Sequence, residues 1–267
     1  MKDEFGNRMK AYEKAENPAQ FGPGDYVAAR IDGRTFSKFT KSFNKPFDPS
    51  LMRAMRETTR YLIEKTNAVI GYTQSDEITL LWKVPDEGEM LFNGKKSKLT
   101  SVLASMATIK FASSLIDQKF LEIVRTKLPH FDCRVWKLPN AMEATNVLLW
   151  RAQDARRNAV TSAARSFMSH KKIQGMDQTQ MIESMREDHG IDFHSAYSYL
   201  ERYGTFFVPS KVRSSIPDDV WERIPEPNRP ESRTVYRTEI KIPFVGYFGD
   251  IKNRAEFVFE GAPFETA

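Results

Sequence analysis

Near the start of this 267-residue chain stands the segment Ala28-Ala29-Arg30-Ile31-Asp32-Gly33-Arg34-Thr35-Phe36-Ser37-Lys38-Phe39. The apolar run that begins at Tyr26 predicts a short β-strand that ends near Asp32. Gly33 follows, and a glycine allows the backbone to turn sharply and to approach a ligand closely. The segment therefore predicts a carboxylate at the end of a strand, directly before a turn.

A second carboxylate follows another predicted strand. The apolar run 68–72 leads into Gln74-Ser75-Asp76-Glu77, and residues 78–82 read as the next strand, so Ser75 to Glu77 form a tight strand-to-strand connection. If this hairpin lies beside the strand that carries Asp32, the carboxylates of Asp32 and Asp76 converge.

Two converging carboxylates repel each other unless a cation lies between them, and an oxygen-only pair suits Mg²⁺. The backbone N–H groups of residues 33–37, just after the turn, form a place where phosphate oxygens can bind. The pattern therefore indicates a metal and nucleotide site. The alternative is that Asp-Gly and Ser-Asp-Glu are ordinary polar turns.

The composition limits the classes of protein that need to be considered. The chain has 40 Lys and Arg against 35 Asp and Glu, a formal charge of +5 and a pI near 9.1, which is compatible with a nucleic-acid partner. The single cysteine, Cys133, excludes an intramolecular disulfide, and the four histidines show no zinc-binding pattern. Because no secretory or membrane-spanning run is present, we expect a soluble protein of the cytoplasm that does not contact a membrane.

The order of elements up to residue 140 predicts the fold. After a first helix over 3–16 and the Asp32 strand, Asp48-Pro49 predicts the start of an amphipathic helix over 51–66. The hairpin follows, then a long helix over 98–116 and a strand over 131–136. This βαββαβ order predicts an α+β fold with a ferredoxin-like or polymerase-palm core, an antiparallel sheet covered by helices.

Beyond Asn140 the composition changes and predicts a mainly helical extension. We expect helices over 142–168, 178–189 and 193–202, an irregular Pro-rich flap over 208–230, and strands over 234–242 and 256–259. We therefore divide the chain into a first domain, 1–140, which carries the two acidic turns, and a C-terminal region, 141–267, that packs on it and whose basic helix could contact RNA.

These motifs resemble those of the tRNA-histidine guanylyltransferase (Thg1) family, including its bacterial and archaeal Thg1-like members. The resemblance covers roughly the first 160 residues, and the C-terminal third matches only loosely. The motifs that carry it are Arg30-Ile31-Asp32-Gly33-Arg34-x-Phe36, Lys45-Pro46-x-Asp48, Gln74-Ser75-Asp76-Glu77, Ser97-Lys98, Phe131-Asp132-x-Arg134 and Trp150-Arg151-x-x-Asp154.

The resemblance implies a palm-like enzyme that adds nucleotides to the 5′ end of tRNA, in the 3′-to-5′ direction. Asp32 and Asp76 would be catalytic, and together with the carbonyl of Gly33 they would hold two Mg²⁺ ions. The incoming ATP, GTP or other NTP would bind Asp32, Gly33, Arg34, Thr35, Phe36, Ser37, Lys45, Asp48, Ser75 and Asp76. The resemblance also implies a homotetramer, arranged as a dimer of dimers.

Two further sets of residues follow from the same resemblance. The activating nucleotide, ATP in an initial 5′-adenylylation, would bind Lys95, Ser97, Lys98 and Arg134. Contacts with RNA are expected on the long helix, at Arg151, Arg156, Arg157 and Asn158.

One departure from the family pattern favours a particular member type. Eukaryotic enzymes that add the extra G to tRNA-histidine carry His-Ile-Asn-Asn where this chain has Arg156-Arg157-Asn158-Ala159. This difference favours a Thg1-like protein that repairs truncated tRNA 5′ ends by template-dependent addition. The alternatives are a dedicated tRNA(His) guanylyltransferase, an RNA-independent nucleotide cyclase, and a tRNA-binding module without catalysis.

Overall fold

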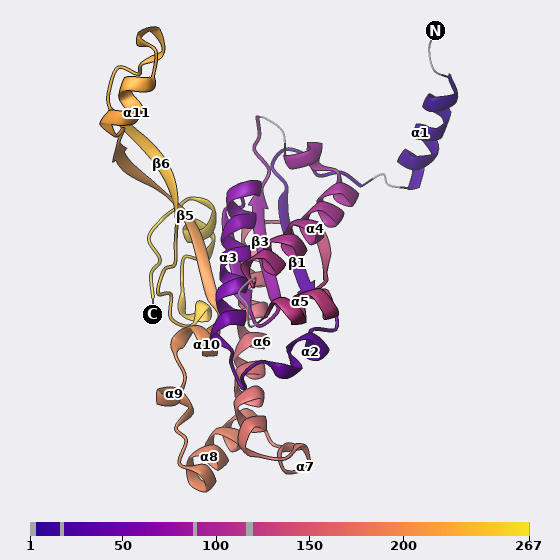
Figure 1. Cartoon of the computed structure of the whole chain (residues 1–267), viewed down its shortest axis with the longest axis vertical. Coiled ribbons are helices and arrows are strands. Elements are labelled where there is room, and N and C mark those ends of the chain that lie inside the picture. Colours follow the sequence, from indigo (N-terminus) through magenta and orange to yellow (C-terminus); the bar gives the residue numbers. More distant parts are fainter. Residues whose placement is uncertain (1–3, 17–18, 88–89, 116–119, 267) are drawn as a thin grey trace.

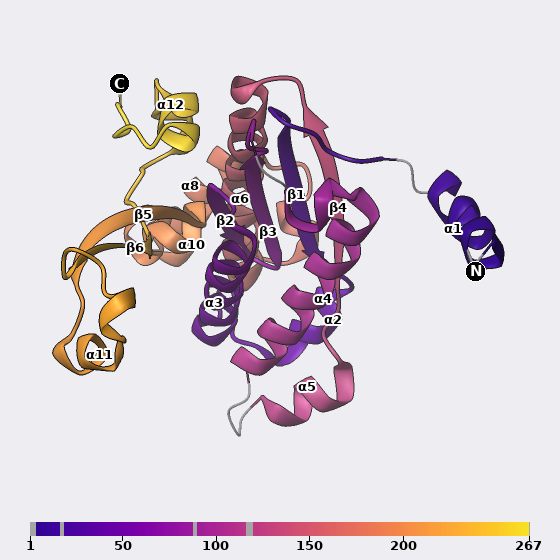
Figure 2. The same ribbon diagram turned by 90° about the horizontal axis from the view of Figure 1, so that it is seen from above.

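The computed structural model describes residues 4–16, 19–87, 90–115 and 120–266 (Figure 1). The first helix, α1 (Glu4–Glu16), lies apart from the rest of the molecule in both ribbon views (Figures 1 and 2). The predicted helix start at Asp3 lies outside the described residues.

The centre of the molecule is a six-stranded sheet in which all neighbouring strands are antiparallel, in the order β4-β1-β3-β2-β5-β6. Its strands are β1 (Tyr26–Gly33), β2 (Ile70–Gln74), β3 (Glu77–Lys83), β4 (Phe131–Leu138), β5 (Thr205–Ser215) and β6 (Thr234–Lys241). With α3 between β1 and β2 and α4 between β3 and β4, the first four strands have the predicted βαββαβ order. The predicted α+β fold class is confirmed.

One face of the sheet is covered by the helices that precede β4. Asp48 begins α3 by accepting hydrogen bonds from the backbone N–H groups of Ser50 and Leu51, with Pro49 in the first turn, as the sequence predicts. The elements on this side are α2 (Phe36–Phe39), η1 (Thr40–Ser42), α3 (Pro49–Thr66), η2 (Leu91–Gly94), α4 (Lys96–Ser114) and α5 (Leu121–Lys127).

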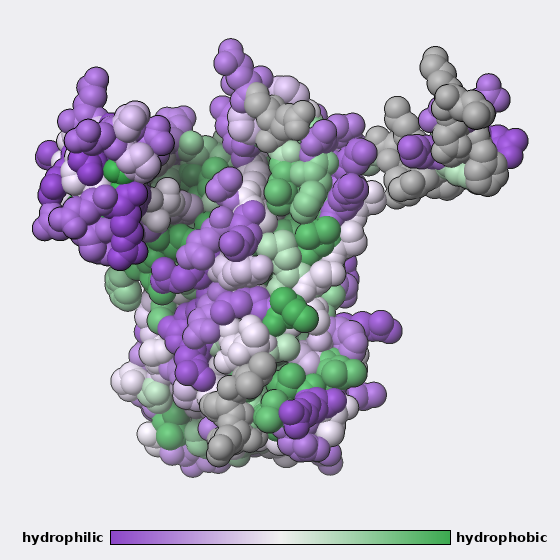
Figure 3. All heavy atoms as spheres, turned by 45° about the horizontal axis from the view of Figure 1, so that its top comes forward, coloured by the Kyte–Doolittle hydropathy of each residue, from purple (hydrophilic) through white to green (hydrophobic). Residues whose placement is uncertain are grey.

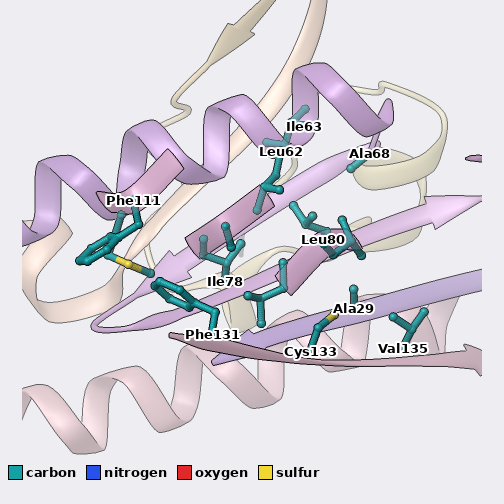
Figure 4. Packing of buried hydrophobic residues seen from close by; sticks show 14 of the residues in the cluster. Ala29, Leu62, Ile63, Ala68, Ile78, Leu80, Phe111, Phe131, Cys133 and Val135 are labelled. Carbon is teal, nitrogen blue, oxygen red and sulfur yellow. The ribbon is translucent and has the colours of Figure 1, made fainter. Parts of the chain in front are cut away.

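The main hydrophobic core lies between these helices and the sheet. Figure 4 shows Leu62 and Ile63 of α3 and Phe111 of α4 against Ile78 and Leu80 of β3. These side chains are almost wholly buried, and burial of each contributes roughly 1.5–3 kcal/mol to folding. The core therefore fixes β1 and β3 beside each other and holds the ends that carry Asp32 and Asp76.

The opposite face is covered by the helix α6 (Ala141–Phe167), with η4 (Phe248–Asp250) and α12 (Arg254–Phe259) beside it. Ala144, Leu148 and Ala152 of α6 pack in one cluster with Ala28 of β1 and Leu81 of β3. Because side chains alternate along a strand, Arg30 and Asp32 of β1 lie on the same face as Ala28. The long helix therefore runs beside the polar part of β1.

Beyond the sheet, α6 continues into a small helical cluster. Its last three turns bury Val160 and Ala163 against Met185 and Phe193. The other helices in this part are α7 (His170–Ile173), α8 (Gln178–His189), α9 (Phe193–Ala196) and α10 (Tyr199–Tyr203). The single helix predicted over 193–202 is thus two short ones, because Ser198 starts a new helix with a capping box to Glu201.

The flap predicted over 208–230 is wrong. Strand β5 pairs with β2 only over Thr205 to Phe207 and then continues with β6 as a two-stranded ribbon that projects from the body (Figures 1 and 2). Pro209 is tolerated because, in the part of the chain that the structure describes, β5 pairs with β6 alone along the ribbon. The tip carries α11 (Asp218–Arg223) and η3 (Glu226–Asn228), and Figure 3 shows mostly hydrophilic residues there.

A second correction concerns residues 256–259, which belong to the helix α12 and not to a strand. Four residues of mixed polarity cannot distinguish a strand from one helical turn. Among the residues that the structure describes, no helix is both long and apolar enough to cross a membrane.

Candidate active site

Asp32 and Asp76 lie at the same end of the sheet, as the sequence predicts. In the β1–β3 pair, Asp32 stands opposite Glu77, and Asp76 is the residue before Glu77. The backbone N–H of Gly33 donates a hydrogen bond of 3.0 Å to the carbonyl of Asp76. The backbone therefore holds the two acidic segments together.

The backbone at this end has little freedom. A Cβ on Gly33 would lie 2.4 Å from the ring of Phe36, so only glycine fits without moving that ring. Phe36 is itself buried against Phe111 and Phe131. Ser75 has a φ of 52°, and its hydroxyl donates to the carboxylate of Asp76 at 3.1 Å. The turn and its acid are thus fixed by the aromatic core and by local hydrogen bonds.

The electrostatics of the two carboxylates suit a bound cation. Burial raises the pKa of Asp76, and the charge of Asp32 raises it further. Burial also raises the pKa of Asp32, and the charge of Asp132 adds to this effect, while Arg30, Arg134 and Arg151 oppose it. A divalent cation between the carboxylates would remove this repulsion.

The donor set is therefore compatible with Mg²⁺, which prefers oxygen ligands and usually keeps several waters. It consists of two half-buried carboxylates and the carbonyl of Gly33. Within the described residues no cluster of three or more His, Cys, Asp or Glu side chains is arranged to hold a metal. A metal ion at this end would thus be coordinated by the carboxylates of Asp32 and Asp76 and by oxygens of the substrate.

A cavity of about 620 Å³ opens beside Asp76. This volume is in the range of sites for small molecules. Its walls come from the segment 36–56, from the β2–β3 turn, from α6 between Asn158 and Ser166, and from residues 200–205. The predicted residues that line it are Phe36, Ser37, Lys45, Asp48, Ser75, Asp76 and Asn158.

Four predicted nucleotide residues do not line this cavity: Asp32, Gly33, Arg34 and Thr35. Arg34 and Thr35 are exposed, and Thr35 has a φ of 58° at the start of α2. The carboxylate of Asp32 instead faces the α6 side of the sheet. Asp32 therefore does not line the cavity, although α6 forms one of the cavity walls.

Asp48 shapes the cavity wall. Its carboxylate is buried and accepts hydrogen bonds from the backbone N–H groups of Asn44, Ser50 and Leu51, at 3.0, 2.9 and 3.1 Å. These bonds tie the segment that carries Lys45 to the first turn of α3. Lys45 itself is exposed at the rim.

Arg151, one of the predicted RNA contacts, lies in a buried ion-pair network. Arg151 is buried, and its guanidinium donates at 2.7 Å both to Glu77 and to Asp154. Asp154 in turn pairs with Arg157 at 2.9 Å. Arg151 thus joins α6 to the strand after Asp76, a role that no local sequence pattern indicates because Glu77 is 74 positions away in the chain.

The remaining residues of the predicted RNA set lie nearer the surface. Arg157 and Asn158 are exposed and Arg156 is half-buried. Since Asn158 also lines the cavity, this part of α6 connects the surface with the cavity.

The predicted activating-nucleotide residues are not brought together within one chain. Lys95, Ser97 and Lys98 lie at the start of α4. Lys95 forms an isolated antiparallel β-bridge with Gln20, which precedes β1 in the chain. Asp32 is near the other end of β1, roughly 20 Å away at about 3.3 Å per residue. Arg134 lies midway along β4, opposite Arg30 and on the face away from α4.

Comparisons with known proteins agree with this geometry. A family profile described as tRNAHis guanylyltransferase (Thg1) matches residues 6–139. An uncharacterised protein of Acanthamoeba polyphaga mimivirus is 32% identical over 231 residues, which cover 79% of this chain and 78% of the relative. The tRNA(His) guanylyltransferase of Schizosaccharomyces pombe is 33% identical over 153 residues, 56% of each chain.

The similarity extends to solved structures. A bacterial tRNA(His) guanylyltransferase (Thg1)-like protein in complex with ATP superposes with a TM-score of 0.73 at 28% identity, over 96% of this chain and 99% of the other. The corresponding complex with GTP gives a TM-score of 0.69 at 27% identity, over 96% and 100% of the chains.

The antiparallel palm-like sheet, with two acids at one end beside a cavity, defines a nucleotidyltransferase. More specifically, the chain belongs to the tRNA(His) guanylyltransferase (Thg1) family.

Proposed function

We propose that this protein is a template-dependent 3′-5′ nucleotidyltransferase that repairs the 5′ ends of truncated tRNAs after ATP-dependent 5′-adenylylation. The observation that supports it best is the convergence of Asp32 and Asp76 beside a cavity of about 620 Å³. The similarity to a bacterial Thg1-like protein that binds ATP and GTP supports the same assignment.

The reaction needs two phosphoryl transfers. In the first, an oxygen of the RNA 5′-monophosphate attacks the α-phosphorus of ATP, and pyrophosphate leaves. In the second, the 3′-hydroxyl of the incoming NTP attacks the activated 5′-phosphorus, and AMP leaves. Each step forms one P–O bond and breaks one, so neither requires a covalent protein intermediate.

The side chains have distinct parts in this scheme. Asp32, Asp76 and the carbonyl of Gly33 would hold two Mg²⁺ ions, which would supply charge neutralisation and activation of the attacking hydroxyl. Lys45, at the cavity rim, neutralises phosphate charge. Ser37 and Ser75 offer hydroxyls on the cavity wall. The chain thus acts by positioning and by charge.

We assign RNA contacts to Arg156, Arg157 and Asn158 and, more broadly, to the region 141–267. The exposed guanidinium of Arg157 and the amide of Asn158 lie on the turn of α6 next to the cavity. An RNA end that enters the cavity would pass these side chains. The helix α6 of this region packs along the sheet of the catalytic domain, 1–140.

Because the α4 cluster and Arg134 lie on opposite faces of the sheet, their joint use would require at least a dimer, and the homotetramer, arranged as a dimer of dimers, is proposed from the family resemblance. Lys95, Ser97 and Lys98 can serve the same activating nucleotide as Arg134 only if a second copy of the chain supplies one of the two sets. Light scattering during size-exclusion chromatography measures the assembly, and a monomer at micromolar concentration would contradict it. The proposed place of action is the cytoplasm, with tRNA as the partner.

Dedicated G addition to tRNA(His) is the second candidate. The identity to the enzyme of S. pombe favours it. The segment Arg156-Arg157-Asn158-Ala159 favours repair, because it differs from the family's His-Ile-Asn-Asn.

The test is incubation with Mg²⁺, ATP and all four NTPs on a 5′-monophosphorylated tRNA that lacks its first nucleotide. The opposite acceptor base is varied, and the products are separated on a sequencing gel. If the added base follows the complement of the opposite base, the enzyme is a templated polymerase. Addition of G alone to tRNA(His) alone would establish the second candidate, and consumption of NTP without RNA would establish a cyclase.

A further inference from the structure

The short helix α10 forms part of the wall of the cavity beside Asp76 and also carries aromatic side chains. Leu200 and Glu201 line the cavity. Tyr199 and Tyr203 are four positions apart and therefore share a face of the helix, and their rings stack with centres 5.1 Å apart. One helix thus carries both a part of the cavity wall and a pair of stacked rings.

A third ring, from the segment after β6, completes this aromatic cluster. The centre of the Phe244 ring lies 4.6 Å from that of Tyr199, and the hydroxyl of Tyr199 donates a hydrogen bond to the carbonyl of Gly246. These contacts tie the segment to α10, yet Phe244 remains 74% exposed. We refer to Tyr199, Tyr203 and Phe244 as the aromatic platform.

The platform has a fixed position relative to Asp76. The hydroxyl of Tyr72, on β2, donates a 2.8 Å hydrogen bond to the carbonyl of Tyr203. The next residue, Gly204, has a φ of 77°, and a Cβ there would lie 2.6 Å from the same hydroxyl. Since β2 ends at Gln74, directly before the turn that carries Asp76, the platform is anchored to the carboxylate end of the sheet.

Arg202 adds a positive charge next to the platform. Its guanidinium carbon lies 5.4 Å from the centre of the Tyr203 ring, and one of its terminal nitrogens contacts Nδ1 of His194 at 3.0 Å. Within the described residues its Nε is buried without a hydrogen-bond partner, and no carboxylate forms an ion pair with it. A guanidinium without an acidic partner favours a phosphate.

Exposed aromatic rings beside a basic side chain are typical of surfaces that bind single-stranded nucleic acid, because unpaired bases stack on the rings and phosphates meet the positive charge. In tRNA the unpaired 3′ end begins at the same end of the acceptor stem as the 5′ terminus. An RNA whose 5′ terminus lies at Asp76 therefore brings its unpaired 3′ end close to α10.

We propose that the aromatic platform and Arg202 bind the unpaired 3′ end of the tRNA acceptor stem, with one base on Phe244 and a phosphate at Arg202. This inference rests on the proposed function, which places the 5′ end of the same stem in the cavity. Holding the 3′ strand positions the template base opposite the site of addition. The platform itself takes no part in the chemistry.

Phe244 is the side chain that tests this proposal. Because most of its surface is exposed, Phe244→Ala should leave the melting temperature nearly unchanged. Tyr236→Ala is the matched control, because Tyr236 is also 74% exposed but lies on the projecting ribbon, in β6. Phe244→Trp keeps an aromatic ring on the platform.

Fluorescence anisotropy measures the binding of two labelled, 5′-phosphorylated acceptor-stem hairpins, one with an unpaired 3′ extension and one blunt. We expect the wild type, Tyr236→Ala and Phe244→Trp to bind the extended hairpin about tenfold more tightly than the blunt one, as one stacked base predicts. Phe244→Ala should lose this preference and keep its affinity for the blunt hairpin. Equal affinity of the wild type for both hairpins, or an unchanged preference in Phe244→Ala, would overturn the proposal.

Two controls test other uses of the platform. An extension of abasic nucleotides keeps the phosphates without the bases, so the wild type should bind it more weakly than the normal extension, and equal binding would rule out a stacked base. Light scattering compares the assembly of Phe244→Ala with that of the wild type. A changed assembly with an unchanged RNA preference would make the platform a contact between copies of the chain and would overturn the proposal.

Turnover separates this proposal from the proposed function. With extended RNA the KM of Phe244→Ala should rise by about tenfold while kcat stays the same. If the wild type prefers the extended hairpin but adds no nucleotide to any RNA, the proposed function fails and the platform remains an RNA-binding surface. If it adds nucleotides to extended and blunt RNA with equal KM, the platform fails and the proposed function stands.

Discussion

The Nε of Arg151 donates a 2.7 Å hydrogen bond to Glu77, the residue directly after Asp76. This bond connects the middle of α6 to the start of β3 across a separation of 74 positions in the chain. The same guanidinium also bonds to Asp154. The position of Asp76 therefore depends on a buried ion pair as well as on its own strand.

Arg151→Ala should lower the free energy of unfolding by about 3–5 kcal/mol, because it leaves the carboxylate of Glu77 without its close partner in a buried place. Urea denaturation measures the change. Arg157→Ala is the matched control, because Arg157 pairs with the same Asp154 but its side chain is 51% exposed. Arg157→Ala should lower the free energy of unfolding by less than about 1 kcal/mol. An equal decrease in the two variants would contradict the role given to Arg151.

Gly33→Ala should reduce both stability and nucleotide addition. Its Cβ would lie 2.4 Å from the Phe36 ring, and the displacement of a packed ring costs about 1–3 kcal/mol. The control is Gly22→Ala, where nothing lies within 4 Å of the added carbon. Thermal melting and the gel assay compare the two, and a Gly33→Ala protein as active and stable as Gly22→Ala would argue against a tightly fixed turn.

Without metal, the carboxylates of Asp32 and Asp76 should make the protein less stable as the pH rises. Burial raises the pKa of both groups above the ordinary value of 3.8, and the charge of Asp132 adds to this effect for Asp32 while the charge of Asp32 adds to it for Asp76. Between that value and the raised one, the folded state binds more protons than the unfolded state, so stability falls with rising pH. Above the raised values the destabilisation is complete.

Melting temperatures in EDTA across pH 4 to 8 test this expectation. Asp76→Asn should be more stable than the wild type at neutral pH, and the difference should shrink toward pH 4. Mg²⁺ should raise the melting temperature of the wild type but have little effect on Asp76→Asn. If Mg²⁺ stabilises the wild type and Asp76→Asn equally, Asp32 and Asp76 do not form the Mg²⁺ site.

Lys98→Ala and Arg134→Ala should mainly impair the ATP-dependent first step. An RNA that already carries a 5′-triphosphate supplies its own leaving group, so it should recover part of the lost rate. Single-turnover assays on 5′-monophosphorylated and 5′-triphosphorylated RNA give the comparison. Lys83→Ala, an exposed lysine near the end of β3, controls for lost positive charge, and an equal loss on both RNAs would contradict the assigned role.

The sequence was sufficient for the palm-like core because its signals are local. The apolar runs that end at Asp32 and precede Ser75 mark strand ends, and the capping pattern at Asp48 marks the start of α3. The convergence of Asp32 and Asp76 then follows from the order of the strands.

The features that were missed depend on distant contacts. Arg151 finds its partner 74 residues away, so no local pattern distinguishes it from the exposed Arg157. The ribbon of β5 and β6 obtains its hydrogen bonds from a strand that follows after the tip, and Pro209 favoured an irregular segment. The order of the motifs along the chain also does not indicate that Lys98 lies near the start of β1 whereas Asp32 lies near its end.

The most direct measurement is nucleotide addition to a 5′-phosphorylated truncated tRNA by Asp32→Asn and Asp76→Asn, compared with the wild type. Asp86→Asn, on an exposed loop, serves as the control, and circular dichroism verifies the fold of each variant. We expect both active-site variants to lose at least about a thousandfold in rate while remaining folded, and the control to retain full activity. Near-normal turnover in either folded active-site variant would contradict the assignment of this carboxylate pair as the catalytic centre.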